Sequence, residues 1–109
     1  MKARINFTGE LIISQTNNED IKLEILEVID TIILNFQEEY EDVIGYKEVV
    51  DINFDKSITK NKPIEITITW QGPINPSQID ELKRLEHHAE GLVLDVNIEH
   101  IHVETKVWE

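Results

Sequence analysis

The order and spacing of the apolar residues predict an α+β domain with two helices on one face of a four-stranded, mostly antiparallel sheet. Stretches with strand alternation and stretches with helical periodicity follow one another as strand, helix, strand, strand, helix, strand. Two right-handed β–α–β crossings in this order place both helices on the same side of the sheet. The sequence therefore predicts the ferredoxin-like βαββαβ arrangement.

The first strand is predicted near the N-terminus, where apolar and polar side chains alternate. Its apolar members are Ile5, Phe7, Leu11 and Ile13. Gly9 interrupts the alternation, which indicates either a bulge or a close approach of another part of the chain.

The stretch Thr16–Gly45 is predicted to form one long amphipathic helix. Its apolar residues recur every three or four positions, which gathers them on one helical face: Ile21, Ile25, Val28, Ile29, Ile32, Phe36 and Tyr40. Thr16 and Glu19 fit a capping box at its start. Gly45 is predicted to end the helix in a left-handed conformation.

Two strands joined by a hairpin are predicted next. The first is Lys47–Asp55, with Val50, Ile52 and Phe54 on one side. Ser57–Pro63 is polar and is expected to be the hairpin loop. The second strand, Ile64–Gln71, alternates most regularly and is expected to bury Ile64, Ile66, Ile68 and Trp70.

The second helix is expected to begin at Asn75 or Ser77, with Pro76 in its first turn, and to stop at Gly91. Its inner face contains Ile79, Leu82, Leu85 and Ala89.

The last strand is expected to begin at Leu92, with Leu94, Val96 and Ile98 facing inward. The apolar phase then shifts to Ile101, Val103 and Val107, which predicts a bulge near Glu99–His100. We find no internal repeat, low-complexity segment or linker, so residues 1–109 are expected to form one domain.

The sheet face without helices is expected to be polar. Its predicted members are Arg4, Asn6, Thr8, Glu10, Asp51, Asn53, Asp55, Glu65, Thr67, Thr69, Gln71, Asp95, Asn97 and Glu99. This face lacks the exposed aromatic residues with which single-stranded RNA binders of this architecture stack bases. It is interpreted either as a solvated face or as a binding surface.

The charge balance indicates the kind of partner. Ten Lys and Arg residues against 22 Asp and Glu residues give a formal net charge of −12. Direct binding to nucleic acid or to an anionic membrane requires the opposite sign, so the expected partner is a basic protein. The chain contains no cysteine and no long apolar run, which is consistent with a soluble cytoplasmic protein.

The densest group of carboxylates lies at the end of the long helix. Glu38, Glu39, Glu41 and Asp42 surround Tyr40, and these five residues are the predicted partner-binding site. Carboxylates at a helix C-terminus oppose the helix dipole, which is unfavourable. A locally unfavourable choice of this kind is expected where binding was selected over stability, although a solvated acidic face would look the same.

No catalytic or cofactor motif is recognisable, and neither a cofactor nor a metal is expected. His100 and His102 on the last strand leave one alternative, a small acid–base or metal site completed by Glu104, Asp95 or Glu99. His87 and His88 are expected to lie too far away to join them.

The leading hypothesis is a small non-enzymatic binding protein that engages a basic, possibly nucleic-acid-binding, protein, as inhibitors, immunity proteins and counter-defence proteins do. The alternatives are an enzyme or metal site around His100 and His102, or a structural subunit that assembles through an edge strand. Trp108, near the chain end, is expected either to anchor an interface or to cover the edge of the core. The oligomeric state is left open.

The high net charge predicts that salt stabilises the fold. The melting temperature should rise between about 0.01 M and about 0.3 M NaCl, because the Debye length falls from about 30 Å to below about 10 Å and repulsion between carboxylates is screened. Thermal unfolding at a fixed, low protein concentration measures this. A flat or falling melting temperature would mean that the carboxylates are already paired or too dispersed to repel.

Overall fold

The computed structural model describes residues 1–12, 18–45, 47–54 and 62–109, and the structural statements below concern these residues. The four strands are β1 (Lys2–Leu11), β2 (Glu48–Phe54), β3 (Ile64–Pro73) and β4 (Ile98–Trp108). They form one sheet in the order β2-β3-β1-β4, in which every neighbouring pair is antiparallel. This order, with a helix after β1 and another after β3, is the ferredoxin-like α+β fold, and the predicted fold class is confirmed.

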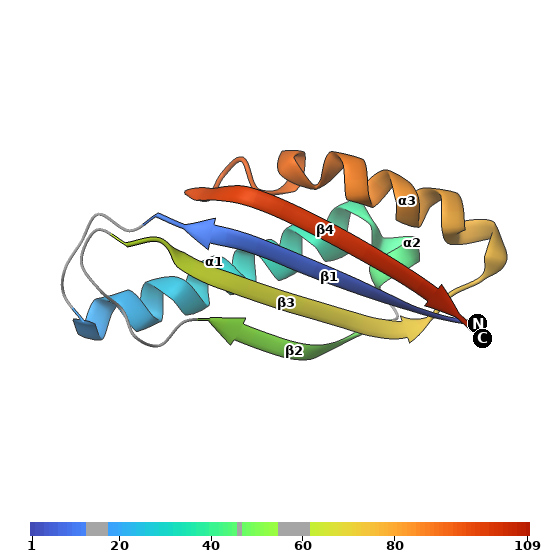
Figure 1. The fold of residues 1–109 in the computed structure, drawn as a ribbon, viewed down its shortest axis with the longest axis horizontal. Helices are drawn as coiled ribbons and strands as arrows, with labels where there is room; N and C mark the ends of the chain where they lie inside the picture. Colours follow the sequence, from blue (N-terminus) through green and yellow to red (C-terminus); the bar gives the residue numbers. More distant parts are fainter. Residues whose placement is uncertain (13–17, 46, 55–61) are drawn as a thin grey trace.

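The helical elements lie on one side of the sheet. They are α1 (Asn18–Glu39), α2 (Glu41–Ile44), the short 3-10 turn η1 (Pro76–Gln78), α3 (Ile79–His88) and a second 3-10 turn, η2 (Ala89–Leu92). Figure 1 views the sheet with α1 behind it and α3 beside β4. The opposite face has no helix over it in the described part of the chain.

Residues from both helices and three strands share one core, as the sequence predicts. The predicted members Ile25, Ile32, Phe36, Ile66, Ile68, Leu82 and Leu85 are all fully buried. Phe36 of α1 lies at the centre, with its ring stacked on Trp70 of β3 at 5.2 Å and edge-on to Phe7 of β1 at 5.5 Å. These contacts fix α1 across the two central strands.

The prediction of one helix over Thr16–Gly45 is wrong at its C-terminal end. Helix α1 stops at Glu39, Tyr40 leaves helical geometry with φ −122°, and α2 begins at Glu41. A ten-residue strand is about 33 Å long and a 22-residue helix is also about 33 Å, so α1 already spans the sheet. Continuing straight would carry the chain beyond the core, whereas the turn at Tyr40 buries Val43 and Ile44.

Gly45 does not adopt the predicted left-handed conformation, since its φ is −56°. A Cβ atom at this position would lie 2.5 Å from the carbonyl oxygen of Glu41, so close approach of the backbone is the reason for glycine. Thr16, and with it the predicted capping box, lies outside the described residues.

The predicted bulge in the last strand is confirmed. Thr8 pairs with His102 and Glu10 pairs with Glu99, so His100 and Ile101 together face the single residue Gly9. His100 is the one described non-glycine residue with positive φ, at 53°. A Cβ atom at Gly9 would lie 2.7 Å from Cδ1 of Ile98, which identifies Gly9 as the point of close approach.

The prediction that the last strand starts at Leu92 is wrong. Helix α3 ends at His88, Gly91 lies inside η2 rather than ending a helix, and β4 begins only at Ile98. Ile98 pairs with Leu11, the last residue of β1, so the residues before Ile98 have no partner strand in β1. Leu94, predicted to face inward, is 84% exposed.

The edge strand β2 also differs in part from the prediction. Ile52 and Phe54 pair with Ile68 and Ile66 and therefore share the helix-covered side, as expected. The register shifts between Val49 and Asp51, which makes Val50 the extra residue of a bulge, and Val50 is exposed. Ile52, at the same edge of the sheet, is also exposed. Asp55 and the hairpin residues 57–61 lie outside the described residues.

The central position of Phe36 gives a test of the fold. Truncating Phe36 to Ala should lower the free energy of unfolding by about 3–5 kcal/mol, since the cavity removes contacts with both Phe7 and Trp70. Denaturant unfolding monitored by circular dichroism measures the loss. Leu34→Ala, on the exposed side of the same helix, is the control and should change stability by less than about 1 kcal/mol. Equal losses in the two variants would contradict the observed helix phase.

Candidate functional site

The predicted acidic site is divided by the turn at Tyr40. Glu38 and Glu39 end α1, whereas Glu41 and Asp42 form the first turn of α2. All four carboxylates are exposed. The expected conflict with the helix dipole holds for Glu38 and Glu39 only, because acidic residues are favourable at the start of a helix.

Tyr40 has a structural role at this turn. Its ring is half-buried against the core, and its backbone carbonyl accepts hydrogen bonds from the amides of Val43 and Ile44. Burial raises the pKa of Tyr40, and the nearby charges of Glu39 and Glu81 raise it further against an opposing effect of Arg84. The phenol therefore stays neutral at physiological pH and packs the turn onto the core.

Asp42 faces a different part of the molecule from Glu38 and Glu39. It lines a small hollow of about 260 Å³ together with Lys47, Asn75 and Gln78, and the Gln78 amide donates to the Asp42 carbonyl at 2.7 Å. The Gln78 side-chain oxygen also accepts a hydrogen bond from the Asn75 backbone amide at 3.1 Å. Asn75, one of the two predicted starts of the second helix, caps the turn η1, whereas α3 itself begins only at Ile79. The hydrogen bond between Gln78 and Asp42 thus connects α2 to the residue that precedes α3.

Lys47 is the buried charged residue of the described chain. Its ammonium donates to the carbonyl oxygens of Val43 and Pro73, and it therefore caps the C-terminal end of α2. Burial lowers the pKa of Lys47 from its usual value of 10.5. The described residues provide no carboxylate partner for it.

Glu38 and Glu39 lie beside the segment that precedes β4. They line a hollow of about 280 Å³ with Asn35, Leu94 and Asp95. The Asn35 amide donates to the Leu92 carbonyl at 2.8 Å and to the Asp95 carboxylate at 3.1 Å, which attaches this segment to α1.

Leu94 projects from the middle of this acidic region. It also lines a neighbouring hollow with Glu90 and His100, so carboxylates lie on both sides of the exposed leucine. We refer to Glu38, Glu39, Glu90, Leu94 and Asp95 as the Leu94 surface. Within the described residues, none of its four carboxylates forms an ion pair. Sequence reasoning missed Leu94 because it continued the strand alternation back to Leu92.

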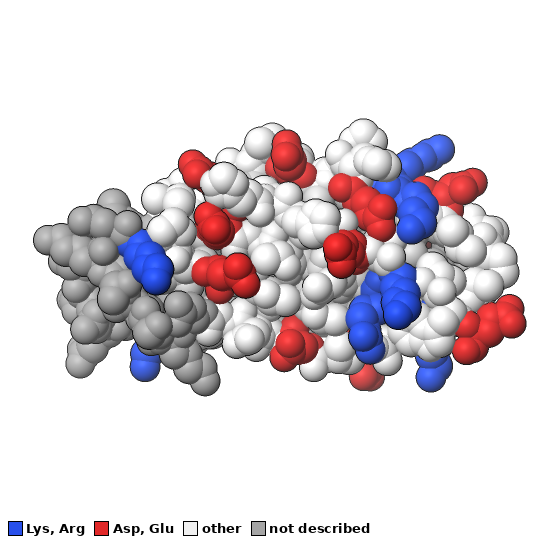
Figure 2. All heavy atoms as spheres, in the orientation of Figure 1, with Lys and Arg blue, Asp and Glu red and all other residues white. Residues whose placement is uncertain are grey.

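The open sheet face is polar, as predicted, but its composition differs on β4. The strand register places Glu99, His102, Glu104, Lys106 and Trp108 on this face, beside Glu10, Thr8, Asn6, Arg4 and Lys2. Asp95 and Asn97 precede β4 and are not part of it, contrary to the prediction. The face is therefore less acidic than expected. In Figure 2, most visible Lys and Arg side chains gather toward the sheet end that holds both chain termini.

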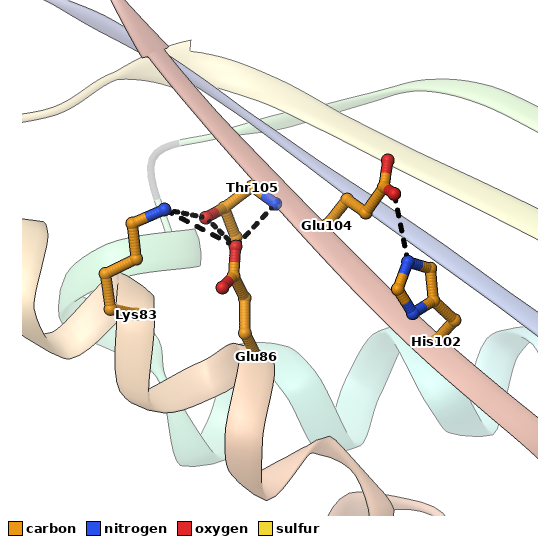
Figure 3. A network of polar contacts seen from close by, with 5 residues as sticks. All are labelled: Lys83, Glu86, His102, Glu104 and Thr105. Atoms are coloured by element: carbon orange, nitrogen blue, oxygen red, sulfur yellow. Dashed lines mark hydrogen bonds and ion pairs between the residues drawn. The ribbon is translucent and has the colours of Figure 1, made fainter.

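Arg4 and the β4 side chains surround a hollow of about 710 Å³ on this face. The Arg4 guanidinium donates twice to the Gln71 side-chain oxygen, at 2.8 and 3.1 Å, and lies 5.7 Å from the centre of the half-buried Trp108 ring. His102 and Glu104 are 3.0 Å apart (Figure 3), and both are about two-thirds exposed. Trp108 thus contributes to the open face rather than to the core.

The free edge of β4 is closed by α3. The Glu86 carboxylate accepts a hydrogen bond of 2.8 Å from the Thr105 amide and another from the Thr105 hydroxyl, and Lys83 lies 3.5 Å away (Figure 3). Burial tends to raise the pKa of Glu86, but the bonds from Thr105 and the charge of Lys83 outweigh it and hold the pKa below its usual range. An ionised carboxylate on this amide blocks pairing with another strand.

Of the residues considered for an acid–base or metal site, the structure brings only His102 and Glu104 together. His102 lies beside Glu104, whereas His100 lies 3.8 Å from Glu10 on the other side of the bulge. Among the residues that the structure describes, no three His, Asp or Glu side chains are placed to hold a metal ion.

The described helices also include none long and apolar enough to span a membrane.

Comparisons with known proteins extend no further than the fold. No protein-family model and no curated protein sequence matches the chain. Among solved structures, the de novo designed protein Foldit4 is 14% identical over 100% of both chains, with a TM-score of 0.52. A dimeric ferredoxin-like protein from an uncultured marine organism is 16% identical over 99% of this chain and 97% of its own, with a TM-score of 0.43. At these identities the likeness concerns the fold alone.

The buried Lys47 predicts a specific pH dependence. Because its folded-state pKa is below 10.5, the unfolded chain binds more protons between the two pKa values, and stability rises with pH through that interval. The free energy of unfolding of the wild type minus that of Lys47→Met should therefore increase from neutral to alkaline pH. Urea unfolding of both proteins between about pH 7 and 11 measures it. Tyr40, whose raised pKa acts in the opposite direction, is present in both proteins and cancels. A constant or decreasing difference would contradict the burial of a charged Lys47.

Proposed function

We propose that this protein is a small, non-enzymatic binding protein whose Leu94 surface engages a basic protein partner. The observation that supports it most directly is the exposure of Leu94 between carboxylates. A leucine that is 84% exposed gains apolar contact only by meeting another surface. Its acidic neighbours restrict that surface to one that carries positive charge.

The geometry of the Leu94 surface suits such a contact. Asn35 holds the Leu92–Asp95 segment against α1 through two hydrogen bonds, so the leucine is presented from a fixed position. A pre-positioned apolar side chain loses less conformational freedom on binding than a mobile one does. The surrounding carboxylates have no ion partner in the described chain and are available to Lys or Arg side chains of a partner.

Charge supports a partner that itself binds nucleic acid. The formal net charge of −12 would accelerate association with a basic protein by long-range attraction. Carboxylates placed where phosphates would otherwise lie could block a nucleic-acid site. We therefore propose an inhibitor, immunity or counter-defence role, carried out in the cytoplasm.

The alternatives have less support from the geometry. An acid–base site at His102 and Glu104 is favoured by their 3.0 Å contact, but both side chains are about two-thirds exposed and no buried group orients them. Assembly through an edge strand is opposed at β4 by the Glu86 contact and is opposed at β2 by its bulge.

The proposal predicts that charge reversal weakens binding without weakening the fold. Replacing Glu38 and Glu39 by Lys should leave stability unchanged or raise it by a few tenths of a kcal/mol per site, because both oppose the α1 dipole. The same change should abolish capture of the partner from lysate at low salt. Leu94→Ser should have the same effect on capture while leaving net charge unchanged.

The matched control replaces Glu24 and Glu27 by Lys on the exposed side of α1, which changes net charge equally. Proteins that the wild type and the control retain, and that both site variants lose, are the specific partners. Equal loss with the control would indicate that only net charge matters. Normal binding by both site variants would place the binding site elsewhere.

A further inference from the structure

The charges of the open face are arranged in rows that cross the strands. Near the chain termini, Lys106, Arg4 and Gln71 are direct neighbours on β4, β1 and β3. At the other end of the same face, Glu99, Glu10 and Glu65 occupy the same three strands. The face is therefore cationic at one end and anionic at the other.

A two-fold axis can bring the cationic row of one copy of the chain over the anionic row of another. Phe7 pairs with Val103 and Ile68, and Ile68 pairs with Ile52, so these residues form a central line across the sheet. Arg4 and Glu10 lie three residues to either side of Phe7. A half-turn about an axis that runs parallel to this line, above the open face, places the position of Arg4 over that of Glu10 and the row of Lys106 over the row of Glu99.

Between the outer rows and the central line, the inner positions are complementary as well. The same half-turn places Glu104 over His102, Asn6 over Thr8, and Asp51 over Asn53. Each carboxylate thus meets an imidazole or an amide, and Thr69 meets Thr67. No pair of like charges is created among these described positions.

Within one copy, the outer rows are unfavourable. Arg4 and Lys106 are direct cross-strand neighbours, as are Glu10 and Glu65, and like charges in such positions repel each other. Arg4 has five N–H donors and directs two of them to Gln71, and the other three form no hydrogen bond with the described residues. The only described ion contact of Glu10 is its long one to the exposed His100, at 3.8 Å.

We propose that the open face binds a second copy of this chain, with the two sheets face to face and the strands antiparallel. Arg4 of each copy then pairs with Glu10 of the other, and Lys106 pairs with Glu99. The half-turn makes the interface isologous, so each contact occurs twice. The like-charged rows of the single chain become opposite-charged contacts in the dimer.

The dimer should be weak and sensitive to conditions. Four strands about 4.8 Å apart and about seven residues long give on the order of 500 Å² per copy, near the lower limit for a specific interface. The net charge of −12 on each copy opposes association. At about 0.15 M salt the Debye length of about 8 Å screens distant charges but not contacting ones, so association should be clearest there.

Charge-swap complementation tests the proposal. Sedimentation equilibrium from about 10 μM to about 1 mM protein, a range suited to weak complexes, should show the wild type rising toward twice its 12.7 kDa mass. Arg4→Glu and Glu10→Lys should each remain monomeric, because each places like charges together at both symmetric contacts. An equimolar mixture should form a heterodimer, because Glu at position 4 of one chain then meets Lys at position 10 of the other.

Matched controls are Arg84→Glu and Glu24→Lys, which make the same charge changes on exposed positions of α3 and α1. Both should dimerise as the wild type does, and melting curves verify that every variant is folded. A wild type that stays monomeric to about 1 mM overturns the proposal. So does a dimer that both open-face variants preserve, or a mixture that stays monomeric. The Leu94 surface borders this face at Glu99. Leu94 itself precedes β4 and lies outside the paired rows, so Leu94→Ser should leave dimerisation intact, and the two proposals can fail separately.

Discussion

The contact of Phe36 with Trp70 and Phe7 is the constraint on which the rest of the structure depends. It fixes α1 over the two central strands β3 and β1, and with it the position at which the helix reaches the end of the sheet. The chain must turn there, which leaves Glu38 and Glu39 exposed on the last turn of α1. Asn35, one residue before Phe36, holds the segment that presents Leu94. The proposed binding surface is thus a direct consequence of how the core packs.

Both edges of the sheet have features that oppose pairing with another strand, and these features differ between β4 and β2. On β4, an amide of the edge is occupied by the Glu86 carboxylate, while on β2 a bulge at Val50 distorts the edge. Both are known ways of preventing strands from adding to a sheet. Interactions with other molecules are then expected at the Leu94 surface and at the open face, which differ in character. The first combines an apolar side chain with carboxylates that form no ion pair within the described residues, and the second has separated positive and negative rows.

The uneven distribution of charge makes the two proposed binding surfaces compatible with a strongly acidic protein. Net charge describes attraction at long distance, where the whole molecule acts as an anion. At contact distance the local arrangement dominates, and there the open face carries Arg4 and Lys106 beside each other. A basic partner would meet the anionic exterior first, whereas a second copy requires exact register between two faces. Salt therefore affects the two interactions differently.

The sequence by itself determined the order of the strands and helices, the core residues and the bulge near His100, because periodicity reports directly which side chains must be buried. It also determined the acidic character and the polar open face. Only tertiary structure could set where α1 ends, since that depends on matching its length to the sheet, and where β4 begins, since a strand needs a partner opposite it. Leu94 was misplaced for this reason, as were Asp95 and Asn97. The pairing of Arg4 with Lys106, and of Glu10 with Glu65 and Glu99, depends on the register between strands far apart in the chain, which no local pattern in the sequence specifies.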